Sequence, residues 1–214
     1  MASRRPRVTR GEGLLEGWLA RKRAEVADRL IPADARRGCI VDIGCGRVPY
    51  FLIQTAFSQK IGLDKIAGGV PARVLERRDL ILIHWDIEKS GYLPLKSNLC
   101  AVVVHLAVIE HIEPERVIPL LREMARILQD NGTLIITTPA AWTDRLLRFM
   151  ARLGLVSAVE IAEHKAAYSR RQLVDLLAQV FDRAQIQAGY FEFGMNIWAV
   201  AKKHTGFRGI AGEL

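Results

Sequence analysis

Short apolar runs alternate with amphipathic segments along the chain from residue 39 onward. The apolar runs are five to eight residues long and rich in β-branched side chains, which is typical of strands. Several are apolar throughout, as expected of parallel strands that are buried on both faces. The pattern predicts strands at 39–44, 60–64, 79–85, 99–106 and 132–138.

Apolar residues at helical spacing predict helices between these strands, at 49–57, 66–77 and 115–129. Pro119 lies inside the last of them and has no backbone N–H to donate, so we expect that helix to kink or to begin later. Asn131-Gly132 is a turn signal that ends it. Upstream, an amphipathic helix over 13–30 packs on its own domain or lies on a membrane surface.

The pattern changes after Pro139. An amphipathic helix is expected at 141–153, and a second one runs from Ser169, a suitable N-cap, to Val180. Two late strands, at about 183–193 and 195–203, are joined at Gly194 as a hairpin. This order predicts an α/β fold: a mostly parallel, Rossmann-like sheet with helices on both faces and one antiparallel strand from the C-terminal hairpin.

Size and charge refine this picture. Half of the 214 residues are hydrophobic, which suits one domain at 13–204, flanked by a disordered basic arm at 1–12 and a flexible tail at 205–214. Ten basic and five acidic residues fall within 1–37, so +5 of the net charge of +8 lies there. Such an excess attracts nucleic acid, an anionic membrane surface or an acidic substrate. No aromatic residue interleaves with the arginines of 1–10, which makes nucleic acid the least favoured partner.

The three cysteines show no metal-type spacing, and no secretory segment follows the Arg-rich start. Both features favour a reducing compartment. The longest apolar run, Leu99–Ile109, is shorter than the roughly 20 residues that a membrane-spanning helix needs. We therefore expect a cytoplasmic protein.

The run Ile-Val-Asp-Ile-Gly-Cys-Gly at 40–46 points to a ligand. A strand leads straight into two glycines, so a ligand can lie against bare backbone. Asp42, Asp64 and Asp86 fall at the ends of the first three predicted strands, where parallel α/β sheets bind ligands. An acid after the second strand accepts hydrogen bonds from the ribose of a nucleotide-like molecule. The structural alternative for each acid is a helix N-cap.

Further motifs follow in order: Gly-Leu-Asp (62–64), Trp-Asp-Ile (85–87), Leu-Pro-Leu (93–95), Val-Ile-Glu-His-Ile (108–112), Arg-Ile-Leu-Gln-Asp-Asn-Gly-Thr-Leu (126–134) and Thr-Thr-Pro (137–139). With Val-Asp-Ile-Gly-Cys-Gly (41–46), they make the chain resemble the class I S-adenosylmethionine-dependent methyltransferases over about residues 14–203. Val48 departs from the family's Gly-x-Gly-x-Gly loop. The Gly-Cys-Gly-x-x-Pro-Tyr start is instead similar to a subgroup with many members in surface-polysaccharide or related glycan pathways.

The resemblance implies S-adenosylmethionine as the cofactor and a set of residues that bind it. The loop residues Asp42, Gly44, Cys45 and Gly46 would cradle its methionine end. Asp64, beside Lys65, would hold the ribose, while Asp86 and Ile87 would meet the adenine. His105 and Leu106 would line the methionine and sulfonium pocket. Carboxylates suit this cationic ligand and disfavour the pyrophosphate of a nicotinamide cofactor.

A general base assists methyl transfer when the acceptor is a hydroxyl, and the candidates are His111, Glu110, His164 and Tyr168, of which the histidines are favoured. The alternative for Glu110 and His111 is a structural turn pair. Related quinone O-methyltransferases hold a metal with Glu-x-x-Glu-His, but Ala107 stands at the first Glu, so we expect no metal. Trp142, Arg145 and Tyr168 are expected to line the acceptor within a helical lid at 140–168. The alternative for Trp142 is a place in the core.

Three functions fit these observations. The first is a methyltransferase that acts on a small-molecule or sugar-/lipid-linked acceptor, at oxygen, with peripheral membrane contact through the basic N-terminus. The second is a methyltransferase-fold protein that binds a ligand or partner without catalysis. The third is an RNA methyltransferase, which rests on the basic arm alone.

Overall fold

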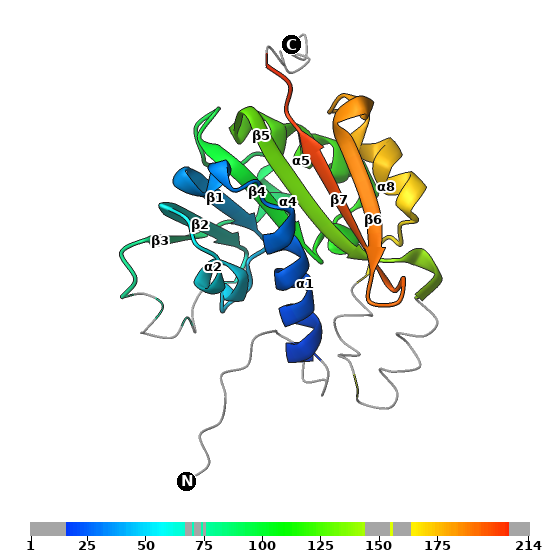
Figure 1. The fold of residues 1–214 in the computed structure, drawn as a ribbon, viewed down its shortest axis with the longest axis horizontal. Helices are drawn as coiled ribbons and strands as arrows, with labels where there is room; N and C mark the ends of the chain where they lie inside the picture. The colour runs from blue at the N-terminus through cyan, green and yellow to red at the C-terminus, as the bar shows by residue number, and fades with distance from the viewer. Residues whose placement is uncertain are drawn as a thin grey trace.

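Seven strands form one sheet in the order β3-β2-β1-β4-β5-β7-β6 (Figure 1). The computed structural model describes residues 16–66, 70, 74, 76–143, 155 and 164–205. The seven strands are β1 Cys39–Ile43, β2 Gln59–Asp64, β3 Leu80–His84, β4 Cys100–Leu106, β5 Leu128–Pro139, β6 Ile186–Phe191 and β7 Asn196–Lys202. Strands β1 to β5 pair in parallel, and β7 runs antiparallel to both β5 and β6. The predicted fold class is confirmed.

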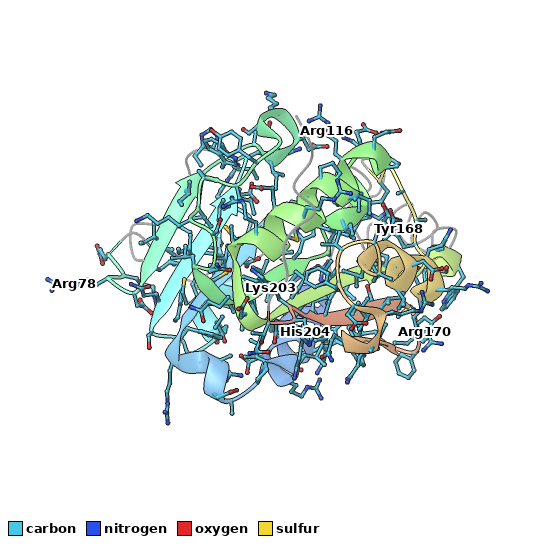
Figure 2. All side chains as sticks on the ribbon, turned by 90° about the horizontal axis from the view of Figure 1, so that it is seen from above. Arg78, Arg116, Tyr168, Arg170, Lys203 and His204 are labelled. Carbon is cyan, nitrogen blue, oxygen red and sulfur yellow. The ribbon has the colours of Figure 1, made fainter. Side chains whose placement is uncertain are left out.

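Helices cover both faces of this sheet. Helices α1 and α2 lie on one face, and α5 and α8 lie on the other, so the sheet separates α1 from α5 (Figures 1 and 2). The helices are α1 Glu16–Leu30, α2 Tyr50–Gln54, α4 Ile87–Ser90, α5 Pro114–Ile127 and α8 Arg170–Leu177. Short 3-10 helices are η1 Asp34–Arg37, η2 Ile109–His111, η3 Ala141–Thr143 and η4 Arg183–Gln185.

Alternation along the central strands builds a separate core on each face. Cys39, Val41 and Ile43 of β1 pack with α5 and α8, whereas Ile40 packs with α1 and α2. The same alternation separates Val103 from Val102 and Val104 on β4. Because successive side chains of a strand point to opposite faces, a strand covered on both sides is apolar throughout.

Two local predictions hold and two need correction. Ser169 caps α8 in a capping box with Gln172, and Gly194 lies in the turn that joins β6 to β7. Of the two outcomes expected for the helix that contains Pro119, the later start is wrong, because α5 begins at Pro114 with Pro119 inside it. Strand β5 begins at Leu128, before the expected turn.

The early start of β5 comes from an irregularity in its pairing with β4. Cys100 pairs with Leu128, but Val102 already pairs with Thr133, so residues 129–132 bulge out of the ladder. Asn131 takes a left-handed φ of 62° within this bulge. The Asn131-Gly132 signal therefore marks a bulge inside a strand and does not end the preceding helix.

Several predictions fall outside the described residues. They are the basic arm at 1–12, most of the helix at 66–77, most of the helix at 141–153 with Arg145, most of the lid at 140–168, and the tail beyond 205. Within the described part of the chain, no helix has the length and apolar character needed to cross a membrane.

Candidate cofactor and active site

A cavity of about 220 Å³ opens at the carboxyl ends of the parallel strands. It exceeds the roughly 30 Å³ that one water molecule occupies in the liquid, so it has room for a ligand. Its walls include all ten residues that the sequence analysis assigned to the cofactor: Asp42, Gly44, Cys45, Gly46, Asp64, Lys65, Asp86, Ile87, His105 and Leu106. The geometry brings this predicted set together, and the role of each residue stays a prediction.

The two glycines of the loop are required for different reasons. Gly44 has a φ of +84°, and a Cβ there would lie 2.5 Å from Val108 Cγ2, so the fold has no room for a side chain. Gly46 has a φ of +71°, and nothing lies within 4 Å of the position that its Cβ would take. Gly46 therefore presents bare backbone beside open space, as a closely bound ligand requires.

Asp64 holds this loop in place from the end of β2. Its Oδ2 accepts a hydrogen bond from the Gly46 N–H at 2.8 Å, and its Oδ1 accepts one from the Ile66 N–H at 2.9 Å. Each carboxylate oxygen can accept more than one hydrogen bond, so these contacts leave acceptor capacity for ligand hydroxyls.

Among the acids that line the cavity, Asp42 has the pKa that lies furthest from its ordinary value. It is 4% exposed, and its Oδ1 has no hydrogen-bond partner among the described residues. Burial, with a smaller contribution from the charge of Asp64, raises the pKa of Asp42 to about 8. A buried carboxyl that lacks a partner suits a cationic or hydrogen-bond-donating ligand.

His105 lies beside it at the end of β4, fully buried. Its Nδ1 lies 2.7 Å from the carbonyl oxygen of Ile43. Because a carbonyl only accepts, Nδ1 carries the proton, and Nε2 is an acceptor that lacks a partner within the described chain. Burial first, and then the charge of His111, lower the pKa of His105 to about 4, so the ring is neutral at pH 7.

The third acid also performs the structural role considered for it. Asp86 caps α4, and its Oδ1 accepts from the backbone N–H of Glu88 at 3.1 Å and of Lys89 at 3.3 Å. Glu88 also lines the cavity, and it binds the Lys65 ammonium at 3.3 Å. Asp86 thus faces the cavity while it starts a helix.

Comparison with protein families decides the class. The profile of a methyltransferase domain family matches residues 15–180. The chain belongs to this methyltransferase family. A search of curated proteins finds no relative by sequence.

Solved methyltransferases share the fold of this domain at low sequence identity. One is an S-adenosylmethionine-dependent methyltransferase from Thermotoga maritima, with 19% identity, a TM-score of 0.65, and 89% of this chain and 91% of that chain covered. Another is the N-methyltransferase NodS from Bradyrhizobium japonicum in complex with S-adenosylhomocysteine. It has 14% identity, a TM-score of 0.62, and coverage of 90% and 89%. These likenesses confirm the class I methyltransferase fold.

The two histidines among the candidate bases of the methyltransferase domain lie side by side. The ring centroids of His111 and His164 are 4.9 Å apart, with the rings edge to face. The carbonyl oxygen of Glu110 accepts from the Lys165 N–H at 2.8 Å, which pins the segment that carries His164. His111 lines the cavity, and the sequence gives no signal for the pair because 53 positions separate its members.

Glu110 completes a compact polar group with these histidines. Its side chain is 2% exposed and accepts a hydrogen bond from the Thr138 hydroxyl at 3.0 Å. Glu110, His111 and His164 each offer one atom that could ligate a metal ion, and these atoms all lie within 4.8 Å of one another. The sequence-based expectation that the methyltransferase holds no metal stays a prediction.

Of the residues predicted to contact the acceptor, the structure describes Trp142 and Tyr168 and places both outside the cavity lining. Trp142 is 60% exposed, and its indole N–H donates to the Gly194 carbonyl at 3.0 Å. Tyr168 is buried and forms an isolated bridge with Ala140 near the start of α8 (Figure 2). Burial, and then the charge of Glu110, raise the pKa of Tyr168. Among the described residues, the cavity lining contains neither Trp142 nor Tyr168.

Helix α1 forms a wall of the cavity that sequence reasoning missed. Ala20, Arg23 and Ala24 line it, at positions that share one face of the helix. The amphipathic pattern of 13–30 predicts a helix that packs on its own domain, and α1 does so. It does not show that the packed helix borders the cavity.

Proposed function

We propose that this chain transfers the methyl group of S-adenosylmethionine to an oxygen of a small-molecule or sugar-/lipid-linked acceptor. The observation that carries the proposal is the gathering of three strand-end acids and a bare glycine backbone in one cavity. The orphaned Oδ1 of buried Asp42 supports it further, because that oxygen suits the positive charge of the cofactor.

The donor set fits S-adenosylmethionine. Asp64 would accept from both ribose hydroxyls. Asp86 would accept from the exocyclic amine of the adenine, beside the backbone of Ile87. The loop from Asp42 to Gly46, with His105 and Leu106, would enclose the methionine end. Carboxylates favour the sulfonium and ammonium charges and would repel the pyrophosphate of a dinucleotide.

The bound cofactor supplies a methyl group already activated by a positive sulfur. The chain must therefore align the acceptor oxygen with that carbon and exclude water, and positioning of this kind supplies up to roughly 7–11 kcal/mol in well-oriented systems. His111 would take the proton of the acceptor hydroxyl as the oxygen–carbon bond forms and the carbon–sulfur bond breaks. Edge-on packing of His164 would orient the ring of His111.

We assign the acceptor side from the sequence pattern. Trp142, Arg145 and Tyr168 would face the acceptor within the lid at 140–168. The Gly-Cys-Gly-x-x-Pro-Tyr start favours a glycan-related acceptor, and the basic N-terminus favours contact with an anionic membrane surface. We propose that the protein works in the cytoplasm, consistent with three free cysteines.

Two measurements on the full chain test this function. Calorimetric titration with S-adenosylhomocysteine should show one saturable site. A labelled-methyl assay over hydroxylated acceptors should then find a substrate. For that substrate, His111→Gln should lower kcat by about 10²- to 10⁴-fold, the range for loss of a general base, while cofactor binding stays within about twofold.

His204→Gln is the matched control for that substitution. His204 follows the end of antiparallel β7, beside the amino ends of the parallel strands and opposite the cavity, and it is exposed. Its replacement should leave both kcat and cofactor binding unchanged. A chain that fails to bind S-adenosylhomocysteine would overturn the proposal, and binding without turnover of any acceptor would favour the non-catalytic alternative.

A further inference from the structure

We propose that Arg23 of α1 binds the carboxylate of the cofactor's methionine moiety and thereby selects ligands that carry an intact amino-acid end. The inference rests on the proposed function and adds to it a residue outside the strand-end motifs. Arg23 lines the cavity between Ala20 and Ala24. Both neighbours have the smallest side chain that carries a Cβ, so this face of the helix leaves space in front of the guanidinium.

The charges on the cavity wall single out Arg23. Four carboxylates line the cavity, from Asp42, Asp64, Asp86 and Glu88, against two Lys or Arg side chains, Arg23 and Lys65. Lys65 already binds Glu88 at 3.3 Å. Within the part of the chain that the structure describes, Arg23 forms no ion pair. A ligand with one anionic group would therefore find its matching cation at Arg23.

The position of Arg23 along the cavity agrees with this match. Asp86 follows β3 and Asp64 ends β2, at one side of the sheet, whereas α1 packs against β4, β5 and β7. The cofactor has its adenine at one end, its ribose next and its amino acid at the other end. With the ribose at Asp64 and the adenine at Asp86, the methionine end points across the glycine loop toward α1.

The chemistry of the two groups fits as well. A guanidinium is planar and presents paired N–H donors that match a carboxylate in bidentate geometry. S-adenosylmethionine carries a single carboxylate, and its ammonium and sulfonium are positive. In a cavity with four acidic side chains, that carboxylate needs a cation more than any other part of the ligand does.

A structural role for Arg23 is the competing explanation. Burial raises the pKa of Glu192 in the β6–β7 turn, and the charge of Arg23 opposes this increase. Arg23 thus lies near enough to Glu192 to steady the contact between α1 and the hairpin. Loss of that support would weaken the fold and would reduce the affinity for every ligand of the cavity alike.

Two ligands separate these roles. S-adenosylhomocysteine has both the ammonium and the carboxylate, whereas its decarboxylated analogue keeps the ammonium and lacks only the carboxylate. In calorimetric titrations, Arg23→Gln should weaken the binding of S-adenosylhomocysteine by about 10- to 100-fold, the range for a lost charge-assisted pair. It should change the binding of the decarboxylated analogue by less than about twofold. Arg23→Lys should give an intermediate loss for S-adenosylhomocysteine alone.

Lys22→Gln is the matched control, because Lys22 is the neighbouring cation and does not line the cavity. Its ammonium pairs with the Glu25 carboxylate at 2.8 Å. The substitution should leave the binding of both ligands unchanged. Equal losses for both ligands in Arg23→Gln, or an unchanged affinity for S-adenosylhomocysteine, would overturn the assignment of Arg23. If the wild-type chain bound neither ligand, the proposed function itself would fail.

Discussion

Protonation of Asp42 should be linked to cofactor binding. Its pKa of about 8 means that the carboxyl is largely protonated in the ligand-free protein at neutral pH. A cofactor ammonium placed nearby favours the ionised form and lowers that pKa. Binding should therefore expel a proton from a residue that the protein keeps neutral in the ligand-free state.

The size of the effect follows from the pKa. A group with a pKa of 8 is about nine-tenths protonated at pH 7, so binding of S-adenosylhomocysteine should release roughly 0.9 proton per site. By the same linkage, the association constant should rise on the order of 50-fold from pH 6 to pH 8. Because the pKa of His105 is about 4, His105 is neutral throughout this range and does not contribute.

Calorimetry in two buffers of different ionisation enthalpy at pH 7 measures the released proton directly. Asp42→Asn, which keeps the shape of the neutral acid, should abolish the release attributable to this site and flatten the dependence on pH. A wild-type chain that exchanges no protons on binding, with a constant affinity from pH 6 to pH 8, would refute the reasoning about Asp42.

The raised pKa of Asp42 also makes the stability of the ligand-free protein depend on pH. The folded pKa lies above the unfolded value of 3.8, so the folded state holds a proton that the unfolded chain has lost. Stability therefore falls as pH rises from about 4 to about 8, and is level above that. Asp42→Asn should remove this fall, so the Tm difference between variant and wild type should grow with pH across that window.

Three further predictions concern the cavity. Asp64→Asn should weaken binding of S-adenosylhomocysteine by about 10- to 100-fold, since the charged acceptor of the ribose hydroxyls is lost, and should lower the Tm, because the N–H of Gly46 or of Ile66 loses its acceptor. Unchanged affinity by calorimetry would count against the ribose role. Gly46→Ala should cost about 1–2 kcal/mol of left-handed strain, whereas Gly44→Ala, which meets Val108, should destabilise the fold more in urea unfolding. Chelators should leave methyl transfer unchanged, and loss restored by a divalent ion would show a metal at Glu110, His111 and His164.

The sequence predicts the strands well because the central ones are buried on both faces. Ile40, Val41 and Ile43 must all be apolar for that reason, and their run is visible without a structure. The start of β5 could not be predicted in this way. It depends on Lys203, whose backbone pairs with Asn131 and Gly132 and whose buried ammonium binds the carbonyl oxygen of Leu128 at 2.6 Å.

The same division applies to the site. The residues assigned to the cofactor sit at strand ends or in the loop after β1, and the topology of a parallel sheet brings such positions together. The contribution of Arg23 and the contact of His111 with His164 depend on how distant segments pack. No local pattern encodes those distances, so these features could be found in the structure alone.

A crystal structure of the full chain with S-adenosylhomocysteine tests the central claim most directly. The account predicts one molecule in the cavity, with its adenine at Asp86, its ribose at Asp64 and its carboxylate toward Arg23. A ligand bound elsewhere, or lying in the reverse direction along the cavity, would contradict the claim that these strand ends form an adenosyl-sulfonium site.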